Sequence, residues 1–346
     1  MSYLIPKPSM WLVAALSICF IATNTVLASD DDDDDGDRQR TKTVNCYKGN
    51  ASVQSKIDKV KAGRDTTIFI VGFCDERVTI TKDGITLSGN KDGGDTIGGG
   101  LTEVKVKGAQ RVRIEYLEVT GAGYGVLVEE GAAVDIANNN IHHNESDGVS
   151  AFHHVFVRVE FNSITSNGLL EPDDGAGIEG GIGATIRSRG NYIANNGWAA
   201  VTIGKTGYYR TARSPAEPYV NDVILQKGCS EGDPLGCGDS KTIAVYCFGN
   251  VLCDFRNANV TGEINISDMS NFAVRNSTIN GTVRIIGMSN FGASNSTING
   301  NVNGVGGSRL ALRTTVVGSG FIYCDPTAFA EIWYLQCNSS IPPPPI

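Results

Sequence analysis

The sequence lacks several features that identify common classes of protein. After residue 28 it has no apolar run of the roughly 20 residues that cross a bilayer. It contains no Cys-x-x-Cys pair, no nucleophile elbow and no phosphate-binding loop. Lysine and arginine, 29 in number, do not exceed aspartate and glutamate, 37 in number. The basic stripe of a nucleic-acid-binding protein is therefore missing, and we expect no nucleic-acid partner.

Glycine and apolar residues, by contrast, are plentiful. Glycine accounts for 42 of 346 residues without a three-residue period, which excludes collagen. The hydrophobic content of 41% is too high for a disordered polymer. The net charge of −8 comes mostly from Asp30–Asp35 and Asp37, since the chain from Arg38 onward has 28 basic and 30 acidic residues. The rest of the chain is therefore nearly neutral and rich in turns.

The N-terminus has the pattern of a secretory signal peptide over residues 1–28. Lys7 precedes the apolar segment Trp11–Ala22, and Val26 and Ala28 occupy positions −3 and −1 of a cleavage site. A membrane anchor is the less favoured alternative because the apolar segment is short. We expect a monomeric protein that is secreted, periplasmic or on the cell surface. Its acidic disordered spacer would cover residues 29–43, and a Pro-rich tail residues 338–346.

Export changes the interpretation of the cysteines. Of nine, Cys19 leaves with the signal peptide. An oxidising compartment favours disulfides over a zinc site, and the four histidines lie far from every cysteine in sequence. Eight cysteines allow 105 connectivities, so pairing by proximity is a hypothesis. The pairs it gives are Cys46 with Cys74, Cys229 with Cys237, Cys247 with Cys253, and Cys324 with Cys337.

Two repeat spacings run through the chain. Met269–Phe272 recurs as Met288–Phe291, and Ser277–Gly281 as Ser296–Gly300, both 19 residues apart. Aliphatic residues also recur 15 apart, at a position n and at n+15, with further apolar residues near n+8 and n+10. The pairs are Val104/Val119, Val126/Ile141, Val149/Ile164, Ile178/Ile193, Val245/Val260, Ile264/Ile279, Val283/Ile298 and Val302/Val317.

Apolar and polar residues alternate within each repeat, which indicates three short strands per unit. Units this small must stack on their neighbours to bury one face. The sequence therefore predicts an all-β fold, a single-stranded parallel β-helix (a solenoid) of ten to twelve coils over residues 44–337. Position n+13 carries Asn139, Asn162 and Asn191, then Ser277 and Ser296, so stacked polar side chains are expected there.

Caps are expected at both ends of the solenoid. Ser52–Ala62 has Val53, Ile57 and Val60 on one face, so it predicts a short N-terminal capping helix held by Cys46 and Cys74. The apolar segment between Cys324 and Cys337 would close the other end.

The repeats GVLVEEGAAVDIANNNIHHN (125–144) and GVSAFHHVFVRVEFNSITSN (148–167) resemble those of right-handed parallel β-helix proteins with the pectin-lyase-like fold. The segment 44–90 is similar to the N-terminal cap and first coils of exported bacterial members. The resemblance implies that the predicted solenoid is a right-handed parallel β-helix and that a groove lies over the outward face of the first strand and its preceding loop. This fold carries lyases, hydrolases, epimerases and adhesins.

The middle coils carry insertions at one position, so their loops are expected to stack along one edge. The insertions are Thr120–Gly125, His142–Gly148, Thr165–Gly177, Ala194–Ala199 and, further along, Gly204–Val220. From these loops and nearby strands we predict binding residues Tyr124, His142, His143, Arg187, Trp198 and Tyr208. Candidate catalytic residues are Asp147, Asp173, Asp174, Glu179 and His153. Such carboxylates bind Ca²⁺ or act as an acid/base pair.

The motifs of particular enzymes are absent. The sequence has no Asp-Pro-His-Glu of alginate epimerases and no Asn-Thr-Asp and Gly-His-Gly set of polygalacturonases. The favoured function is therefore polysaccharide binding or a structural role at the cell surface. A polysaccharide lyase, hydrolase or epimerase acting on an acidic polymer is the first alternative, and an adhesin-like scaffold that binds protein is the second. Ca²⁺ is the one cofactor considered.

Overall fold

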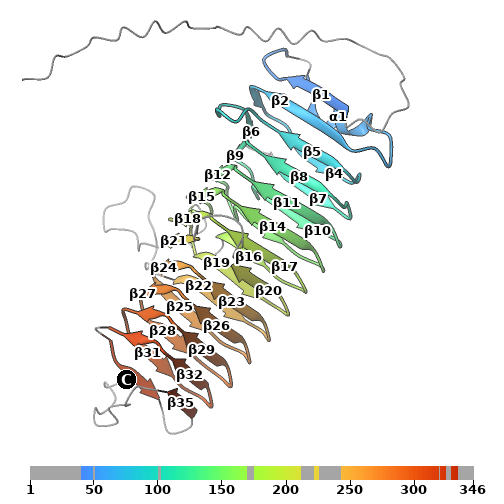
Figure 1. The fold of residues 1–346 in the computed structure, drawn as a ribbon. Coiled ribbons are helices and arrows are strands. Elements are labelled where there is room, and N and C mark those ends of the chain that lie inside the picture. Colours follow the sequence, from blue (N-terminus) through green and yellow to red (C-terminus); the bar gives the residue numbers. More distant parts are fainter. Residues whose placement is uncertain are drawn as a thin grey trace, which may run out of the picture. The chain divides into compact units, whose positions relative to one another are not determined.

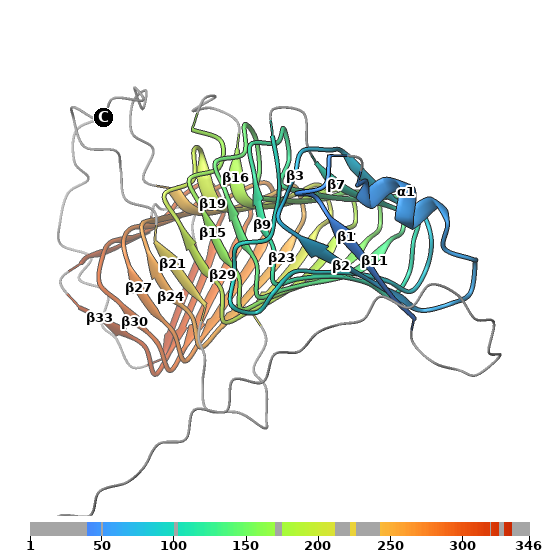
Figure 2. The same cartoon turned by 90° about the horizontal axis from the view of Figure 1, so that it is seen from above.

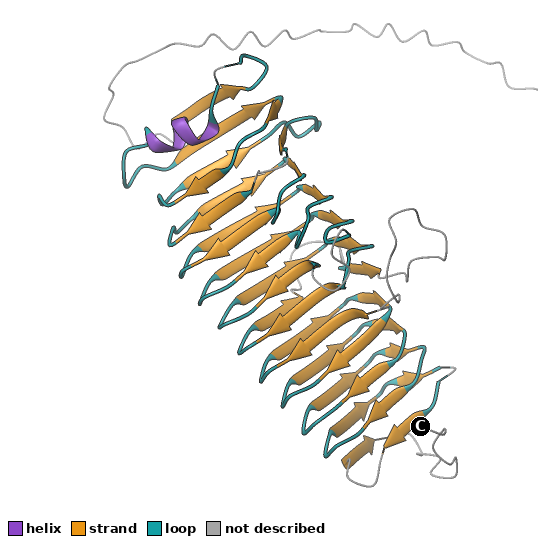
Figure 3. Ribbon diagram, turned by 180° about the vertical axis from the view of Figure 1, so that it is seen from behind, coloured by secondary structure: helices purple, strands orange, loops and turns teal. Residues whose placement is uncertain are grey.

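The structure is a computed structural model that describes residues 40–49, 51–99, 103–169, 175–211, 222–225, 243–318, 320–324 and 329–333. Residues 1–39, Cys229, Cys237, Cys337 and the tail 338–346 lie outside these ranges. Most of the described chain is β-strand, and its one helix, α1 (Val53–Asp58), is purple in Figure 3.

The strands form three parallel sheets. Sheet A contains β1 (Arg40–Asn45), β2 (Thr66–Val71), β5 (Ile85–Ser88), β8 (Val112–Glu115), β11 (Ala133–Ala137), β14 (Phe156–Glu160), β17 (Thr185–Arg189), β20 (Tyr208–Thr211), β23 (Leu252–Arg256), β26 (Asn271–Arg275), β29 (Asn290–Ser294), β32 (Arg309–Arg313) and β35 (Phe329–Trp333). Sheet B contains β3 (Phe73–Cys74), β6 (Thr96–Gly98), β9 (Glu118–Thr120), β12 (Asn140–His142), β15 (Ser163–Thr165), β18 (Tyr192–Ala194), β21 (Val223–Leu225), β24 (Asn259–Thr261), β27 (Thr278–Asn280), β30 (Thr297–Ile298) and β33 (Val316–Val317). Sheet C contains β4 (Val78–Ile80), β7 (Val104–Lys107), β10 (Val126–Glu129), β13 (Val149–Ala151), β16 (Ala176–Gly180), β19 (Ala199–Gly204), β22 (Ile243–Phe248), β25 (Glu263–Ile266), β28 (Val283–Ile285), β31 (Val302–Gly304) and β34 (Ile322–Cys324).

Each coil visits the three sheets in the order C, A, B before the next coil begins. β1 pairs with β2, and from β2 onward each strand pairs in parallel with the strand three further along the chain, as from β11 to β14 to β17. Figure 1 shows the strands of successive coils side by side. About eleven such coils make a right-handed parallel β-helix, which confirms the predicted fold class and coil number.

The core lies between the three sheets. In β14, Val157 and Val159 are fully buried, whereas the residues on either side of each are partly or fully exposed. The parallel register places Val157 between Val134 of the previous coil and Ile186 of the next. Every coil therefore buries its apolar face against two neighbours, as the 15-residue spacing predicts.

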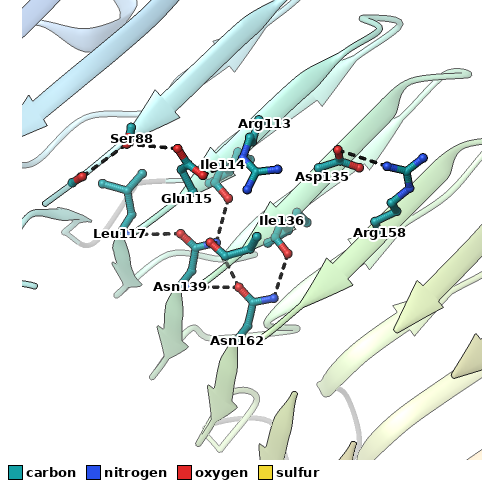
Figure 4. A network of polar contacts seen from close by, with 12 residues as sticks. Ser88, Arg113, Ile114, Glu115, Leu117, Asp135, Ile136, Asn139, Arg158 and Asn162 are labelled. Atoms are coloured by element: carbon teal, nitrogen blue, oxygen red, sulfur yellow. Dashed lines mark hydrogen bonds and ion pairs between the residues drawn. The ribbon is translucent and has the colours of Figure 1, made fainter. Parts of the chain in front are cut away.

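An asparagine ladder lines the bend between sheets A and B, as predicted. Asn139 is 3% exposed, and its amide nitrogen donates to the carbonyls of Ile114 and Ala137 at 2.9 and 3.0 Å. Its Oδ1 accepts the Leu117 N–H at 3.0 Å. Its backbone N–H and its amide both donate to Asn162 Oδ1, at 2.9 and 3.0 Å (Figure 4). The ladder thus satisfies backbone groups of two coils that would otherwise be buried without partners.

The same position continues with other side chains further along. Asn162 donates to Asn191, and Asn191 donates to Asp222 Oδ1 at 2.8 and 3.2 Å. In the late coils a serine takes over, since Ser296 Oγ accepts the Ser277 N–H at 3.2 Å. The predicted stacking of polar side chains therefore holds in both parts of the chain.

A second asparagine ladder, which the sequence analysis did not single out, follows sheet B. Asn144 Nδ2 donates to Asn167 Oδ1 at 2.7 Å, and Asn167 Nδ2 donates to Asn196 Oδ1 at 3.0 Å. A Cβ on Gly148 would lie 2.8 Å from Asn167 Nδ2, and one on Gly177 would lie 2.6 Å from Asn196 Nδ2. These glycines are required because the ladder leaves no room for a side chain.

Helix α1 lies beside β1 and β2 at the N-terminal end of the stack (Figure 2). Val53 and Ile57 are buried in the core, as the apolar spacing predicts, although the helix is shorter than Ser52–Ala62. Glu76 accepts the Ser52 hydroxyl at 2.8 Å and backbone N–H groups of the first turn. The Lys82 ammonium donates to carbonyls at the other end at 2.6 to 3.2 Å. The acidic Glu76 thus pairs with the free N–H groups at the helix N-terminus, and the basic Lys82 pairs with the free carbonyls at its C-terminus, as the helix dipole favours.

The N-terminal boundary and two disulfides complete the fold. β1 begins at Arg40, so residues 40–43 are paired with β2 and do not belong to a disordered spacer ending at residue 43. Cys46 is bonded to Cys74 and Cys247 to Cys253, as expected from proximity. Cys337, the expected partner of Cys324, lies outside the described residues, as do both cysteines of the expected pair Cys229–Cys237. In the part of the chain that is described, no helix is long and apolar enough to span a membrane.

Candidate functional site

The loops that join sheet B to sheet C are longest in the middle coils. They lie in neighbouring coils because the strands on either side pair in register. We call their described residues the loop edge, which comprises residues 121–125, 143–148, 166–169, 175 and 195–198. The predicted catalytic residues Asp173 and Asp174 belong to the third of these loops and lie outside the described residues.

Asp147 is located at the end of one of these loops, just before β13. It is 1% exposed. Its Oδ2 accepts the Ser150 hydroxyl at 2.6 Å, and its Oδ1 accepts the backbone N–H of Ala176 in the next coil at 2.6 Å. The carboxylate therefore joins two successive coils, with both oxygens already bonded.

The outward face of sheet C continues from Asp147 as a polar row. Ser150, Glu179 and Thr202 stand opposite one another in successive coils, about 4.8 Å apart. Ser150 and Thr202 are at most 1% exposed although they point away from the core, and Glu179 is half-buried. The Thr202 hydroxyl finds no hydrogen-bond partner in the described part of the chain. This row therefore presents a carboxylate between two sheltered hydroxyl groups.

Three aromatic rings meet next to this row. Trp198, on the loop before β19, packs edge-on against Tyr246 with ring centroids 5.2 Å apart. Tyr246 follows Thr202 in the register and stacks on Phe248 at 4.8 Å. All three side chains are partly exposed. We call Trp198, Tyr246 and Phe248 the aromatic cluster.

His142 is the last residue of β12 on sheet B, and His143 is the first residue of the loop that follows, within the loop edge. His142 Nε2 is 2.8 Å from Glu118 Oε1, and its Nδ1 is 2.7 Å from His143 Nδ1. The Thr96 hydroxyl donates to Glu118 at 2.8 Å and, together with His142, lowers the pKa of this carboxyl against the opposing effect of burial. The pair is therefore oriented by Glu118, which sequence reasoning did not single out.

The remaining predicted residues are on other faces. Arg187 and Tyr208 point outward from sheet A. His153 occupies the turn from sheet C to sheet A, at the opposite end of β13 from Asp147, with a left-handed backbone (φ 64°). Tyr124 is on the loop edge. The structure thus brings together Tyr124, Asp147, Glu179 and Trp198 along one side, and separates them from His153, Arg187 and Tyr208.

The described residues contain no cluster of three or more His, Cys, Asp or Glu side chains that would hold a metal ion. The Ca²⁺ hypothesis depended mainly on Asp173 and Asp174, which are not described.

Sequence reasoning missed two of the three rings in the aromatic cluster. Tyr246 and Phe248 alternate with buried Val245 and Cys247 on a strand, so their outward direction was readable from the pattern. Their proximity to Trp198 was not, because a long insertion separates the two strands in sequence. The register alone places β22 next to β19.

Comparison with known protein families agrees with this architecture. A family model described as "Right handed beta helix region" matches residues 70–207. No curated protein sequence matches the chain. Solved structures that resemble it include the pectate lyase Pel9A, with 13% identity, a TM-score of 0.48, and coverage of 82% of this chain and 79% of that one.

Two other solved structures are similar at the same low identity. An alginate lyase from a Paenibacillus species has 14% identity and a TM-score of 0.35, over 84% of this chain and 99% of that one. The A-module of an Azotobacter vinelandii mannuronan C-5 epimerase has 13% identity and a TM-score of 0.40, over 81% and 94%. The chain is a right-handed parallel β-helix protein, and no specific enzyme family is matched.

Proposed function

We propose that this protein binds a polysaccharide along the loop edge and the outward face of sheet C. The observation that carries the proposal is the aromatic cluster beside the row Ser150, Glu179 and Thr202. Aromatic rings offer flat apolar surfaces to the faces of sugar rings, while the Glu179 carboxylate, the one partly exposed member of the row, can accept hydrogen bonds from sugar hydroxyls. Both kinds of group project from stacked strands, so their spacing is preset before a ligand binds.

Trp198→Ala is expected to weaken polysaccharide binding about tenfold or more, because truncating a central aromatic contact removes stacking area. Tyr246→Ala is expected to act similarly. Affinity electrophoresis in gels containing different polysaccharides would measure the loss. Tyr192→Ala is the matched control, since Tyr192 is 44% exposed on the outward face of sheet B, away from the cluster. Equal retardation of wild type and Trp198→Ala in every gel would contradict the proposed site.

A polysaccharide lyase, hydrolase or epimerase at the same edge is the second candidate. It is favoured by Glu179, a half-buried carboxylate on the outward face beside the buried Thr202 hydroxyl. Asp147 suits acid/base chemistry less well because both of its oxygens accept hydrogen bonds. An absorbance assay for unsaturated uronate, with and without Ca²⁺, separates binding from lyase activity. Turnover that falls in Glu179→Gln, or in Asp173→Ala/Asp174→Ala, would assign catalysis to this edge.

We further propose that the chain is exported. The signal-like pattern of residues 1–28 supports this, and so do the Cys46–Cys74 and Cys247–Cys253 disulfides, which suit an oxidising compartment. The mature protein is expected to begin at Ser29 when the full chain is expressed in a bacterium. N-terminal sequencing and mass measurement before and after reduction would check both points. An intact N-terminus with all cysteines reduced would contradict export.

A further inference from the structure

The arginines of the solenoid are concentrated on one face. The strands of sheet B contain no lysine or arginine, and those of sheet C contain Lys105, Lys107 and Arg284. Sheet A differs, because its outward positions from β8 to β32 carry many arginines. These are Arg113, Arg158, Arg187, Arg189, Arg210, Arg256, Arg275, Arg309 and Arg313. A chain with net charge −8 thus has a locally basic face.

In the middle coils the arginines form a straight row. Arg158, Arg187 and Arg210 stand opposite one another on β14, β17 and β20, and we call them the arginine row. The coil spacing sets their backbones about 4.8 Å apart. Asp135 and Asp254 occupy the same register position in the coils before and after. Figure 4 shows Arg158 reaching toward Asp135.

An aromatic row runs beside the arginine row. Phe156 and Tyr208 point outward two residues ahead of Arg158 and Arg210, with Thr185 between them in the register. The guanidinium carbons of Arg158 and Arg187 lie 5.6 and 5.1 Å from the centroid of the Phe156 ring. These cation–π contacts hold the two guanidinium groups against the sheet without neutralising them.

The charge of the row is only partly balanced by the protein. Arg158 is 3.5 Å from Asp135, and the two side chains are 49% and 36% exposed. Asp254 is shared between Arg256 at 2.6 Å and Arg210 at 3.5 Å. Among the described residues, no acidic side chain lies within ion-pair distance of Arg187. Like charges opposite one another on adjacent strands repel, so an anionic ligand that spans the row would relieve this repulsion.

We propose that the outward face of sheet A binds a linear anionic polysaccharide, with one anionic group facing each guanidinium of the arginine row. The inference rests on the proposed polysaccharide binding but concerns a second face and a charged class of polymer. The coil spacing is comparable to the length of one sugar residue, so a polymer lying along the row would bring its carboxylate or sulfate groups within reach of the long arginine side chains. The planar guanidinium suits bidentate contact with such groups, and Phe156 and Tyr208 offer surfaces for the sugar rings.

The test compares charge-removing variants of the full chain. Arg158→Gln/Arg187→Gln is expected to bind immobilised polygalacturonate about tenfold more weakly than wild type and to show a shallower dependence on salt. Arg275→Gln/Arg313→Gln removes the same charge from exposed outward positions of sheet A in later coils. This control is expected to bind within about twofold of wild type, because at moderate salt distant charges are screened. Thermal unfolding of each variant confirms that the fold is retained.

Three results would overturn the proposal. Equal losses of affinity in the two variants would mean that only the net charge matters. Unchanged affinity of Arg158→Gln/Arg187→Gln would exclude the arginine row as the binding site. A single-stranded oligonucleotide that binds the row as tightly as polygalacturonate would assign it to nucleic acid. The loop edge is tested separately with Trp198→Ala: if that variant binds normally while the arginine variant does not, the loop-edge site fails and the sheet A site stands.

Discussion

Asn139→Ala is expected to lower the free energy of unfolding by about 3–5 kcal/mol, which is large for one exchange in a domain of marginal stability. The substitution removes the acceptor of the Leu117 N–H and the donor to the Ile114 and Ala137 carbonyls. Each of these groups lies at a buried bend, where an unpaired polar group costs about 1–3 kcal/mol. Denaturant unfolding followed by circular dichroism would measure the difference.

Asn140→Ala is the matched control for this prediction. Asn140 is the next residue, carries the same side chain and is exposed on the outward face of β12. Its replacement is expected to change the free energy of unfolding by less than about 0.5 kcal/mol. If both variants lose the same free energy of unfolding, the hydrogen bonds of the ladder contribute nothing measurable to stability.

Asp222→Asn is expected to stabilise the protein at neutral pH. Asp222 ends the asparagine ladder, is 2% exposed, and has one carboxylate oxygen, Oδ2, with no hydrogen-bond partner in the described chain. Burial raises the pKa of Asp222 from 3.8 to about 6. The folded chain therefore holds a proton that the unfolded chain releases between pH 4 and 6.

The sign of the pH dependence follows from this difference. Because the folded state binds more protons, the free energy of unfolding falls as pH rises from about 4 to about 6, by about 3 kcal/mol, and is level above that. Asparagine cannot ionise, and its Oδ1 can accept from Asn191 as Asn191 does from Asn162. Asp222→Asn should therefore match wild type near pH 4 and exceed it near pH 7.

Unfolding curves at several pH values check this expectation. Asp268→Asn, at an exposed turn, is the control and should differ little from wild type at any pH. Variant and wild-type curves that stay parallel from pH 4 to pH 8 would show that Asp222 does not titrate in this range.

The fold was predictable because every coil of a solenoid repeats the same spacing of apolar residues. The spacing from Val104 to Val119 is weak alone, but eight such pairs define where strands start and which residues face inward. Asn139, Asn162 and Asn191 were recognised for the same reason. The second ladder of Asn144, Asn167 and Asn196 was equally readable, because its members are 23 and 29 residues apart, as in the first ladder. It was overlooked because these asparagines lie within the predicted loop insertions.

The candidate site was harder to predict than the fold. Tyr208 was predicted to lie in the insertion Gly204–Val220 and Arg187 to lie near Asp147, but Tyr208 is in β20 and Arg187 in β17, both strands of sheet A. The position of a residue within its coil decides which of the three sheets carries its side chain. Two residues that are close in sequence can therefore lie on different faces. Tyr246 shows the converse, since the register brings it beside Trp198 across a long insertion.

Binding of the wild-type chain to an array of neutral and anionic polysaccharides would show whether this solenoid is a polysaccharide-binding protein. We expect saturable binding to at least one class of polysaccharide, with the anionic members retained more weakly as salt increases. Failure to retain any polysaccharide, with the protein shown by circular dichroism to be folded, would contradict the account and leave a structural or protein-binding role for the solenoid.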